Sequence, residues 1–186
     1  MRPKVTLPDD TTRPLAPRII GVSPGQRRHG RRLSLFHEMH LREMSRVRRA
    51  MEQVFAANGS AEDLLTTISS MQMVSNMNQF GNLCGATCQI LTGHHSIEDY
   101  HLFPHLLGKS DGLNKVVARL QAEHLVIHDL LVNLAQAATA LIQGPSGAYA
   151  KDLRASFGQL EGFVKSHFGY EQTELEEAIG FYNIEI

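Results

Sequence analysis

Hydrophobic residues recur at helical spacing through most of the chain. From Leu33 to Gly180, apolar positions follow one another at steps of three, four or seven residues, which is the period of a helix with one buried face. Almost no segment shows the strict alternation of apolar and polar residues that is typical of a strand. The pattern therefore predicts an all-α fold, an up-and-down four-helix bundle.

Glycine, proline and capping residues divide this region into four predicted helical segments. The first segment runs from Leu33 to about Asn58-Gly59, and the second runs from about 61 to 106, where its glycines can interrupt the helix. The third runs from the loop 108–112 to the linker 143–147, and the fourth runs from that linker to about 180. Ser60 is the predicted cap of the second segment.

The first 32 residues have a different composition. They hold five of the seven prolines and lack an apolar period, so we expect an irregular arm that can lie over the bundle. The predicted organisation is an arm at 1–32, a bundle at 33–180 and a tail at 181–186. The arm ends in a short basic cluster, for which a solvated helix start is favoured over a contact with an acidic partner or nucleic acid: Arg27, Arg28, His29, Arg31 and Arg32.

Charge and composition argue against several classes of partner. The formal net charge is −1, which gives no overall field to attract nucleic acid or an anionic membrane. No apolar run approaches the roughly 20 residues that cross a bilayer, and the first residues lack the apolar stretch of a signal peptide. Cys84 and Cys88, one helical turn apart, are typical of buried free thiols. We therefore expect a cytoplasmic protein without a nucleic-acid or membrane partner.

The ten histidines suggest metal or proton chemistry. Three predicted helices each carry a pair of metal-ligating residue types four positions apart, on the face that also holds the apolar stripe: His94 and Glu98, His124 and His128, His167 and Glu171. On the first helix His40 lies in register with Phe36 and Val47. His37, one turn earlier, is the alternative ligand from that helix.

Burying so many polar groups is costly unless they bind something. An unpaired imidazole or carboxylate in an apolar core costs several kcal/mol. A metal centre shared by the four helices satisfies all of these groups at once. The competing interpretation, a structural bundle whose polar core is satisfied internally, leaves the repeated pairing unexplained.

The donor set indicates which metal the centre holds. Four ligands saturate zinc, whereas seven suit two octahedral ions that keep open positions. Imidazole nitrogens and carboxylate oxygens suit iron or manganese. We expect two iron ions bridged by glutamate and by an oxo or hydroxo group, with a vacant position that binds dioxygen, peroxide or nitric oxide.

Other polar residues near these pairs are weaker candidates for metal ligands. His101 continues the face of His94 and Glu98, but a position near the end of the bundle and solvent is favoured for it. Glu174 lies one turn beyond Glu171 and is a less certain ligand. His95 and Asp99 are offset by one residue and are expected at an edge between helices.

Three motifs, in order along the chain, resemble those of hemerythrin-like (HHE cation-binding) domains. They are His94-His95-Ser96-Ile97-Glu98-Asp99-Tyr100-His101-Leu102-Phe103-Pro104, Glu123-His124, and His167-Phe168-Gly169-Tyr170-Glu171. The resemblance covers about residues 33 to 180. It implies a di-iron bundle with the ligands His40, His94, Glu98, His124, His128, His167 and Glu171.

One spacing departs from the oxygen-carrying members of that family. In them an aspartate follows the fourth-helix histidine by five residues, whereas Glu171 follows His167 by four. We therefore expect a non-haem di-iron protein that binds or reduces a small oxidant, with peroxidase, catalase-like or nitric oxide-detoxifying activity in view. The alternative is a module that senses iron, oxygen or redox state, or stores iron, without turnover.

Overall fold

The computed structural model describes residues 4–56, 86–144 and 146–186. The predicted helix end at Asn58-Gly59, the predicted cap Ser60 and the thiol of Cys84 lie outside the described residues, and so does the side chain of Cys88. Every regular element in the described part of the chain is helical. The prediction of an all-α bundle is confirmed to this extent.

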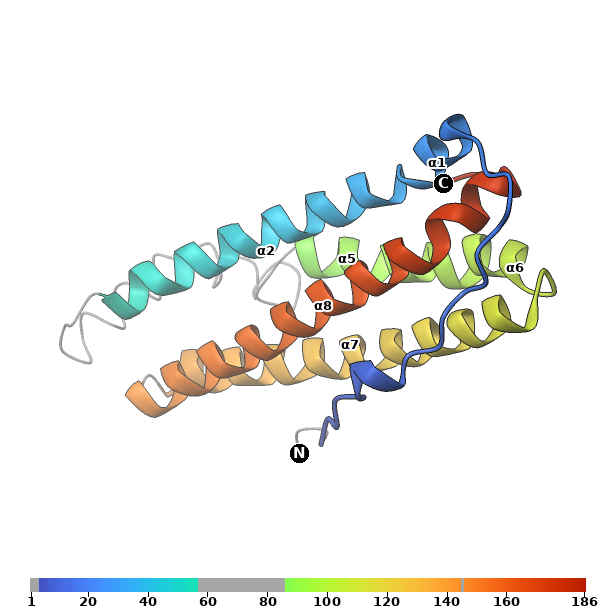
Figure 1. The fold of residues 1–186 in the computed structure, drawn as a ribbon. Coiled ribbons are helices and arrows are strands. Elements are labelled where there is room, and N and C mark those ends of the chain that lie inside the picture. The colour runs from blue at the N-terminus through green and yellow to red at the C-terminus, as the bar shows by residue number, and fades with distance from the viewer. Residues whose placement is uncertain (1–3, 57–85, 145) are drawn as a thin grey trace.

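Four long or composite helical segments lie side by side in the bundle (Figure 1). They are α2 (Leu33–Ala56), α5 (Ala86–Ile97) with η2 (Glu98–Leu102) and α6 (Phe103–Leu106), α7 (Asp111–Gln143), and α8 (Gly147–Phe181). Two short elements precede them, η1 (Asp10–Thr12) and α1 (Pro24–Gly30). The connection between α2 and α5 lies outside the described residues, so the up-and-down order stays a prediction.

Capping serines begin the two longest helices. The Ser110 hydroxyl accepts a hydrogen bond from the Leu113 amide at the start of α7, and Ser146 accepts one from Tyr149 at the start of α8. Such caps satisfy backbone N–H groups that the first turn leaves free. Both expected breaks lie between helices, but they are shorter than the ranges 108–112 and 143–147, because α7 already begins at Asp111 and ends at Gln143 and α8 begins at Gly147.

The hydrophobic core forms two clusters along the bundle axis. One includes Ile127 and Leu160, and the other includes Leu120 and Leu175. On α2, α5 with η2, and α7, the polar residues discussed below fall between these clusters in the sequence, and on α8 they flank the point where the two clusters meet, at Phe168 and Tyr170. Two apolar regions thus enclose a polar centre from both sides.

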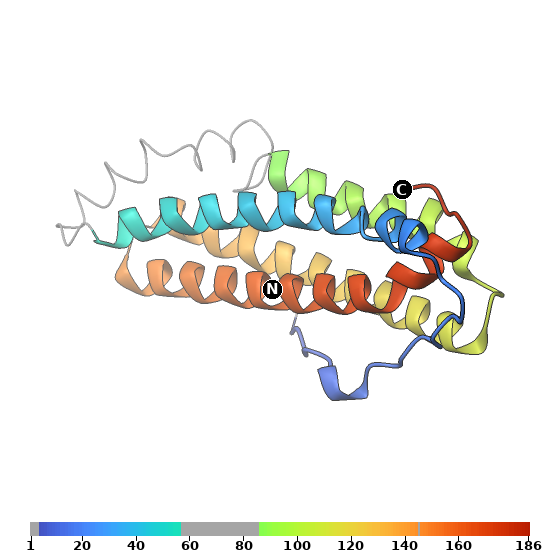
Figure 2. The same ribbon diagram turned by 45° about the horizontal axis from the view of Figure 1, so that its top comes forward.

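The N-terminal arm follows the α7–α8 side of the bundle and then crosses the end of α8 (Figures 1 and 2). The Tyr170 hydroxyl donates to the Pro14 carbonyl at 2.7 Å, and the Ala16 amide donates to Glu174 at 2.6 Å. Arg27 pairs with Glu177 at 2.6 Å. The arm is therefore held to the bundle by defined hydrogen bonds.

Part of the arm is helical rather than irregular. Helix α1 begins at Pro24 after the N-cap Ser23, which forms a reciprocal capping box with Gln26. It crosses α8 at two glycines: a Cβ atom on Gly30 would overlap the Glu176 backbone, and one on Gly180 would overlap the Gln26 backbone. Helices approach this closely only where side chains are missing. The sequence analysis missed this helix because seven residues are too few for an apolar period.

One helix meets the length and hydropathy expected of a membrane span. An 18-residue window of α7 has a mean hydropathy of 1.6, and 33% of that window is buried in the structure. The expectation that no apolar run is long enough thus does not hold for α7. A core helix of a bundle passes the same test, and α7 packs along α8 with one buried face, so the finding is weak evidence for a membrane.

Candidate metal centre

Five histidines and two glutamates meet between the two hydrophobic clusters. Six of them are buried, and the side chain of His94 is 11% exposed. They come from all four helical segments of the bundle: His37 from α2, His94 and His95 from α5, Glu98 at the start of η2, His124 from α7, and His167 and Glu171 from α8.

The cluster has two halves, each able to hold one ion. His37, His94 and Glu98 form a two-histidine half, and His95, His124 and His167 form a three-histidine half. Within each half the potential ligand atoms lie within 4.8 Å of one another.

The two glutamates lie between the halves. Glu98 Oε1 is 2.9 Å from His94 Nε2, while its Oε2 is 3.5 Å from His124 Nε2. Glu171 Oε2 is 3.4 Å from His37 Nε2 and 3.8 Å from His167 Nε2. Each carboxylate therefore faces one histidine of each half, which is the position of a bridging ligand.

Nine donor atoms of this cluster are buried and have no hydrogen-bond partner among the described residues. They are the Nε2 atoms of His37, His94, His95, His124 and His167 and both carboxylate oxygens of Glu98 and Glu171. Buried polar atoms in native proteins are nearly always satisfied. Nitrogen and oxygen lone pairs that converge without partners fit a site for two cations.

The outer ring nitrogens of three of these histidines are held by neighbouring side chains. His167 Nδ1 lies 3.0 Å from Glu123, His124 Nδ1 lies 3.0 Å from Asp99, and His37 Nδ1 lies 2.7 Å from the Gln172 amide. His167 and His124 can donate their Nδ1 protons to these carboxylates and so present the Nε2 lone pair inward. At His37 the Gln172 amide nitrogen is the donor and Nδ1 accepts. The histidine–carboxylate arrangement is characteristic of metal-ligating histidines.

Glu123 connects the centre to the N-terminal arm. Arg13 contacts both Glu123 oxygens at 2.9 Å, and Arg119 Nε lies 2.6 Å from Oε1. Burial opposes ionisation of Glu123, but hydrogen bonds from His167, Arg13 and Arg119 lower its pKa to about 2. A permanently ionised carboxylate thus orients the His167 ring.

Without a metal, several of these side chains hold protons more tightly than usual. Burial and the nearby Glu171 carboxylate raise the pKa of Glu98. Burial opposes protonation of His37 and His124, but carboxylate partners outweigh it and raise the pKa of both rings. Burial lowers the pKa of His94 to about 4, so this ring is neutral at pH 7. A bound cation would replace the retained protons.

The structure brings together five of the seven side chains that the sequence analysis favoured: His94, Glu98, His124, His167 and Glu171. It brings in His37, the alternative from the first helix, in place of His40. His40 is buried beside His94, with ring centroids 4.8 Å apart, and lies outside both groups of ligand atoms.

His128 lies away from the centre. It is exposed, and the buried seam of α7 passes through Leu120, His124, Ile127 and Leu134. Steps of three and four alternate along such a seam because a helix has 3.6 residues per turn. Two successive steps of four, from Leu120 through His124 to His128, leave it.

The two less certain candidates also lie outside the cluster. His101 is exposed, which is the position favoured for it, and the buried face here passes through Glu98, Leu102 and Phe103. Glu174 accepts the Ala16 amide and serves to hold the arm.

His95 takes the place in the cluster that was expected for His128. Its ring stacks against His124 with centroids 4.2 Å apart. The available signal was the pair His94-His95, since adjacent residues on one helix point about 100° apart and can reach two different ions. The residues that hold the outer nitrogens, Asp99 and Glu123, carry no spacing signal, because their partners come from other helices.

The fold and this cluster define a helical-bundle protein with a centre of imidazole and carboxylate ligands. A family model described as the hemerythrin HHE cation binding domain matches residues 31–179. The chain belongs to this family, as its motifs indicated. Comparisons with curated proteins and with solved structures give no significant match.

Ligand identity is tested by three histidine variants. We expect His37→Ala to weaken iron binding by about tenfold or more, because it removes a donor that nothing else replaces. His40→Ala and His128→Ala should retain their iron. Metal analysis after gel filtration measures the difference, and iron loss in His128→Ala equal to that in His37→Ala would contradict the assignment.

The role of the arm is tested at Arg13. Its replacement by alanine leaves buried Glu123 with one arginine, which should cost about 1–3 kcal/mol of stability and weaken iron binding by about tenfold. Arg18→Ala is the control, because that arginine is on the same arm and its side chain is 80% exposed. Thermal unfolding and iron titration measure both effects, and equal behaviour of the two variants would refute the role.

The retained protons predict that metal binding depends on pH. Cations bind the deprotonated ligands, so binding at pH 7 should release protons from Glu98, His37 and His124. Affinity should therefore rise with pH through the neutral range, by up to about tenfold per pH unit for each proton released. Calorimetry of Mn²⁺ binding in two buffers of different ionisation enthalpy measures the proton count. Heats that do not depend on the buffer would argue against it.

Proposed function

We propose that this chain is a non-haem di-iron protein whose centre binds or reduces a small oxidant: dioxygen, hydrogen peroxide or nitric oxide. The observation that carries the proposal is the set of nine buried donor atoms that make no hydrogen bond among the described residues, with two carboxylates placed between two groups of histidines. The proposed scaffold is an up-and-down four-helix bundle.

Iron is favoured by the kind and number of donors. Seven side chains exceed the four ligands of a structural zinc ion. Imidazole and carboxylate groups supply nitrogen and oxygen, which suit iron or manganese. A pair of irons held by the five histidines and the two glutamates would supply electrons to an oxidant bound at the centre.

The side chains around the centre have separate tasks. Asp99, Glu123 and Gln172 fix the orientation of three histidine rings through their outer nitrogens. Phe168 stacks on the His37 ring with centroids 3.9 Å apart, and the two hydrophobic clusters limit the access of water. With the rings oriented in this way, the turnover that we propose is of the peroxidase, catalase-like or nitric oxide-consuming type.

A second candidate, a sensing or storage module without turnover, is favoured by the arm. Arg13 contacts Glu123, and Glu123 contacts the ligand histidine His167. A change of metal or of its oxidation state at His167 would therefore act on the residue that fixes the arm. Such a connection is what a sensor needs to alter a contact with a partner.

The experiment is to load the protein with Fe(II) without oxygen and then add each oxidant. We expect about two irons per chain, oxo-to-iron charge-transfer absorption in the near ultraviolet after oxidation, and consumption of peroxide or nitric oxide. Glu98→Ala should lose most of the iron. Two bound irons without oxidant consumption would favour the second candidate, and a chain that folds equally well and binds no iron would contradict both.

A further inference from the structure

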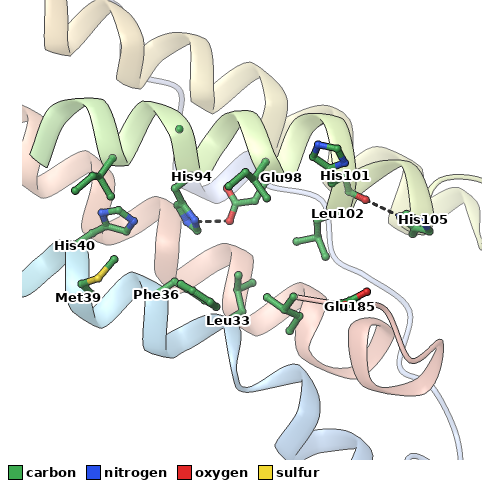
Figure 3. Close-up of a pocket in the computed structure, with 14 residues that line it drawn as sticks. Leu33, Phe36, Met39, His40, His94, Glu98, His101, Leu102, His105 and Glu185 are labelled. Carbon is green, nitrogen blue, oxygen red and sulfur yellow. Dashed lines mark hydrogen bonds and ion pairs between the residues drawn. The ribbon is translucent and has the colours of Figure 1, made fainter. Parts of the chain in front are cut away.

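A pocket of about 710 Å³ lies between α2 and α5, beside the two-histidine half of the centre (Figure 3). Its walls are mainly apolar and include Leu33 and Phe36 from α2 and Ile90 and Ile97 from α5. At its inner wall are His94 and Glu98, which face the α2 side chains across the pocket (Figure 3).

This pocket is much larger than the proposed oxidants require. A water molecule takes up about 30 Å³ in the liquid, and dioxygen, nitric oxide or peroxide needs little more. Pockets of roughly 300–1,000 Å³ are typical of organic ligands and cofactors. The volume therefore suits a molecule with a hydrocarbon body.

Polar groups are placed at the inner wall and the rim. His94 Nε2 and Glu98 Oε1 lie at ion-pair distance, 2.9 Å (Figure 3), and they and Glu98 Oε2 are buried and make no hydrogen bond among the described residues, so they belong to the wall that reaches the centre. His101, His105 and Glu185 lie on the lining farther out along η2, α6 and the C-terminal tail. A few polar groups in an apolar pocket fix the orientation of a ligand.

The two-histidine half also has one fewer imidazole than the other half. It is therefore the half with room for an oxygen donor from outside the chain. A cationic centre attracts an anionic head group, and apolar walls favour a tail that leaves water.

We propose that this pocket binds an organic molecule with an apolar body and a terminal oxygen-donor head group, such as a carboxylate. The head points to the two-histidine half, and the body lies between α2 and α5. The proposal rests on the proposed function, because the head is attracted by the metal centre, and it extends the ligand class beyond diatomic molecules and peroxide.

Gly93 gives a way to test the pocket without changing a ligand residue. It lines the pocket on α5, and a Cβ atom there would meet nothing within 4 Å. A leucine at this position would project into the open space. Gly162 on α8 is a matched control, since it is exposed, lies outside the lining and also has nothing within 4 Å of an added Cβ atom.

The experiment compares decanoate, acetate and azide binding to the iron-loaded wild type, Gly93→Leu and Gly162→Leu. Changes in the absorption of the centre give the affinities. Each buried methylene strengthens binding, so the wild type should prefer decanoate to acetate by about a hundredfold or more. Gly93→Leu should lose most of that preference and keep azide binding, Gly162→Leu should match the wild type, and Gly93→Ala, which adds one carbon, should keep the preference.

The outcomes separate the two proposals. If azide changes the spectrum while decanoate binds no tighter than acetate, or if Gly93→Leu with normal iron content keeps the preference, the pocket proposal is overturned and the proposed function stands. If the chain binds no iron, the proposed function fails. Thermal unfolding of the metal-free protein then tests whether the pocket binds the apolar body of the ligand. Binding there predicts that decanoate stabilises the wild type and Gly162→Leu but not Gly93→Leu. If decanoate stabilises none of them, the pocket proposal is overturned as well.

Discussion

The structure depends on the cost of placing seven polar side chains, six of them buried, in a largely apolar core. Each donor atom that gives up water without a partner costs about 1–3 kcal/mol, and nine such atoms converge at one place. A bound cation gives these donor atoms the favourable interactions that hydrogen bonds within the bundle do not give them. The apolar clusters on both sides limit the access of water, and in doing so they raise both the cost of the empty centre and the affinity of the filled one.

The same constraint explains the layer around the centre and the path of the arm. A ligand histidine binds a metal more tightly when its outer nitrogen is held, and Glu123 holds that of His167. Glu123 is itself buried and needs cations, of which α7 supplies Arg119 and the arm supplies Arg13. Arg13 of the arm precedes the residues matched by the hemerythrin family model, yet it contacts Glu123, which in turn contacts the ligand His167. The arm is therefore part of the site as well as of the fold.

The sequence was sufficient for the helices and for most of the centre, because both depend on local spacing. His94 with Glu98 and His167 with Glu171 are pairs on single helices, and a periodic pattern shows them. The error at His128 arose because two successive steps of four leave the buried seam of α7, so this side chain lies on the exposed face. Contacts such as Arg13 with Glu123 join residues 110 positions apart, and no local pattern encodes them.

The most direct measurement is anomalous diffraction at the iron edge from crystals of the iron-loaded protein. The account predicts two iron positions. One should be bound by His37 and His94, the other by His95, His124 and His167, with Glu98 and Glu171 between them. A single metal position, or ions bound by His40 or His128 instead, would contradict it.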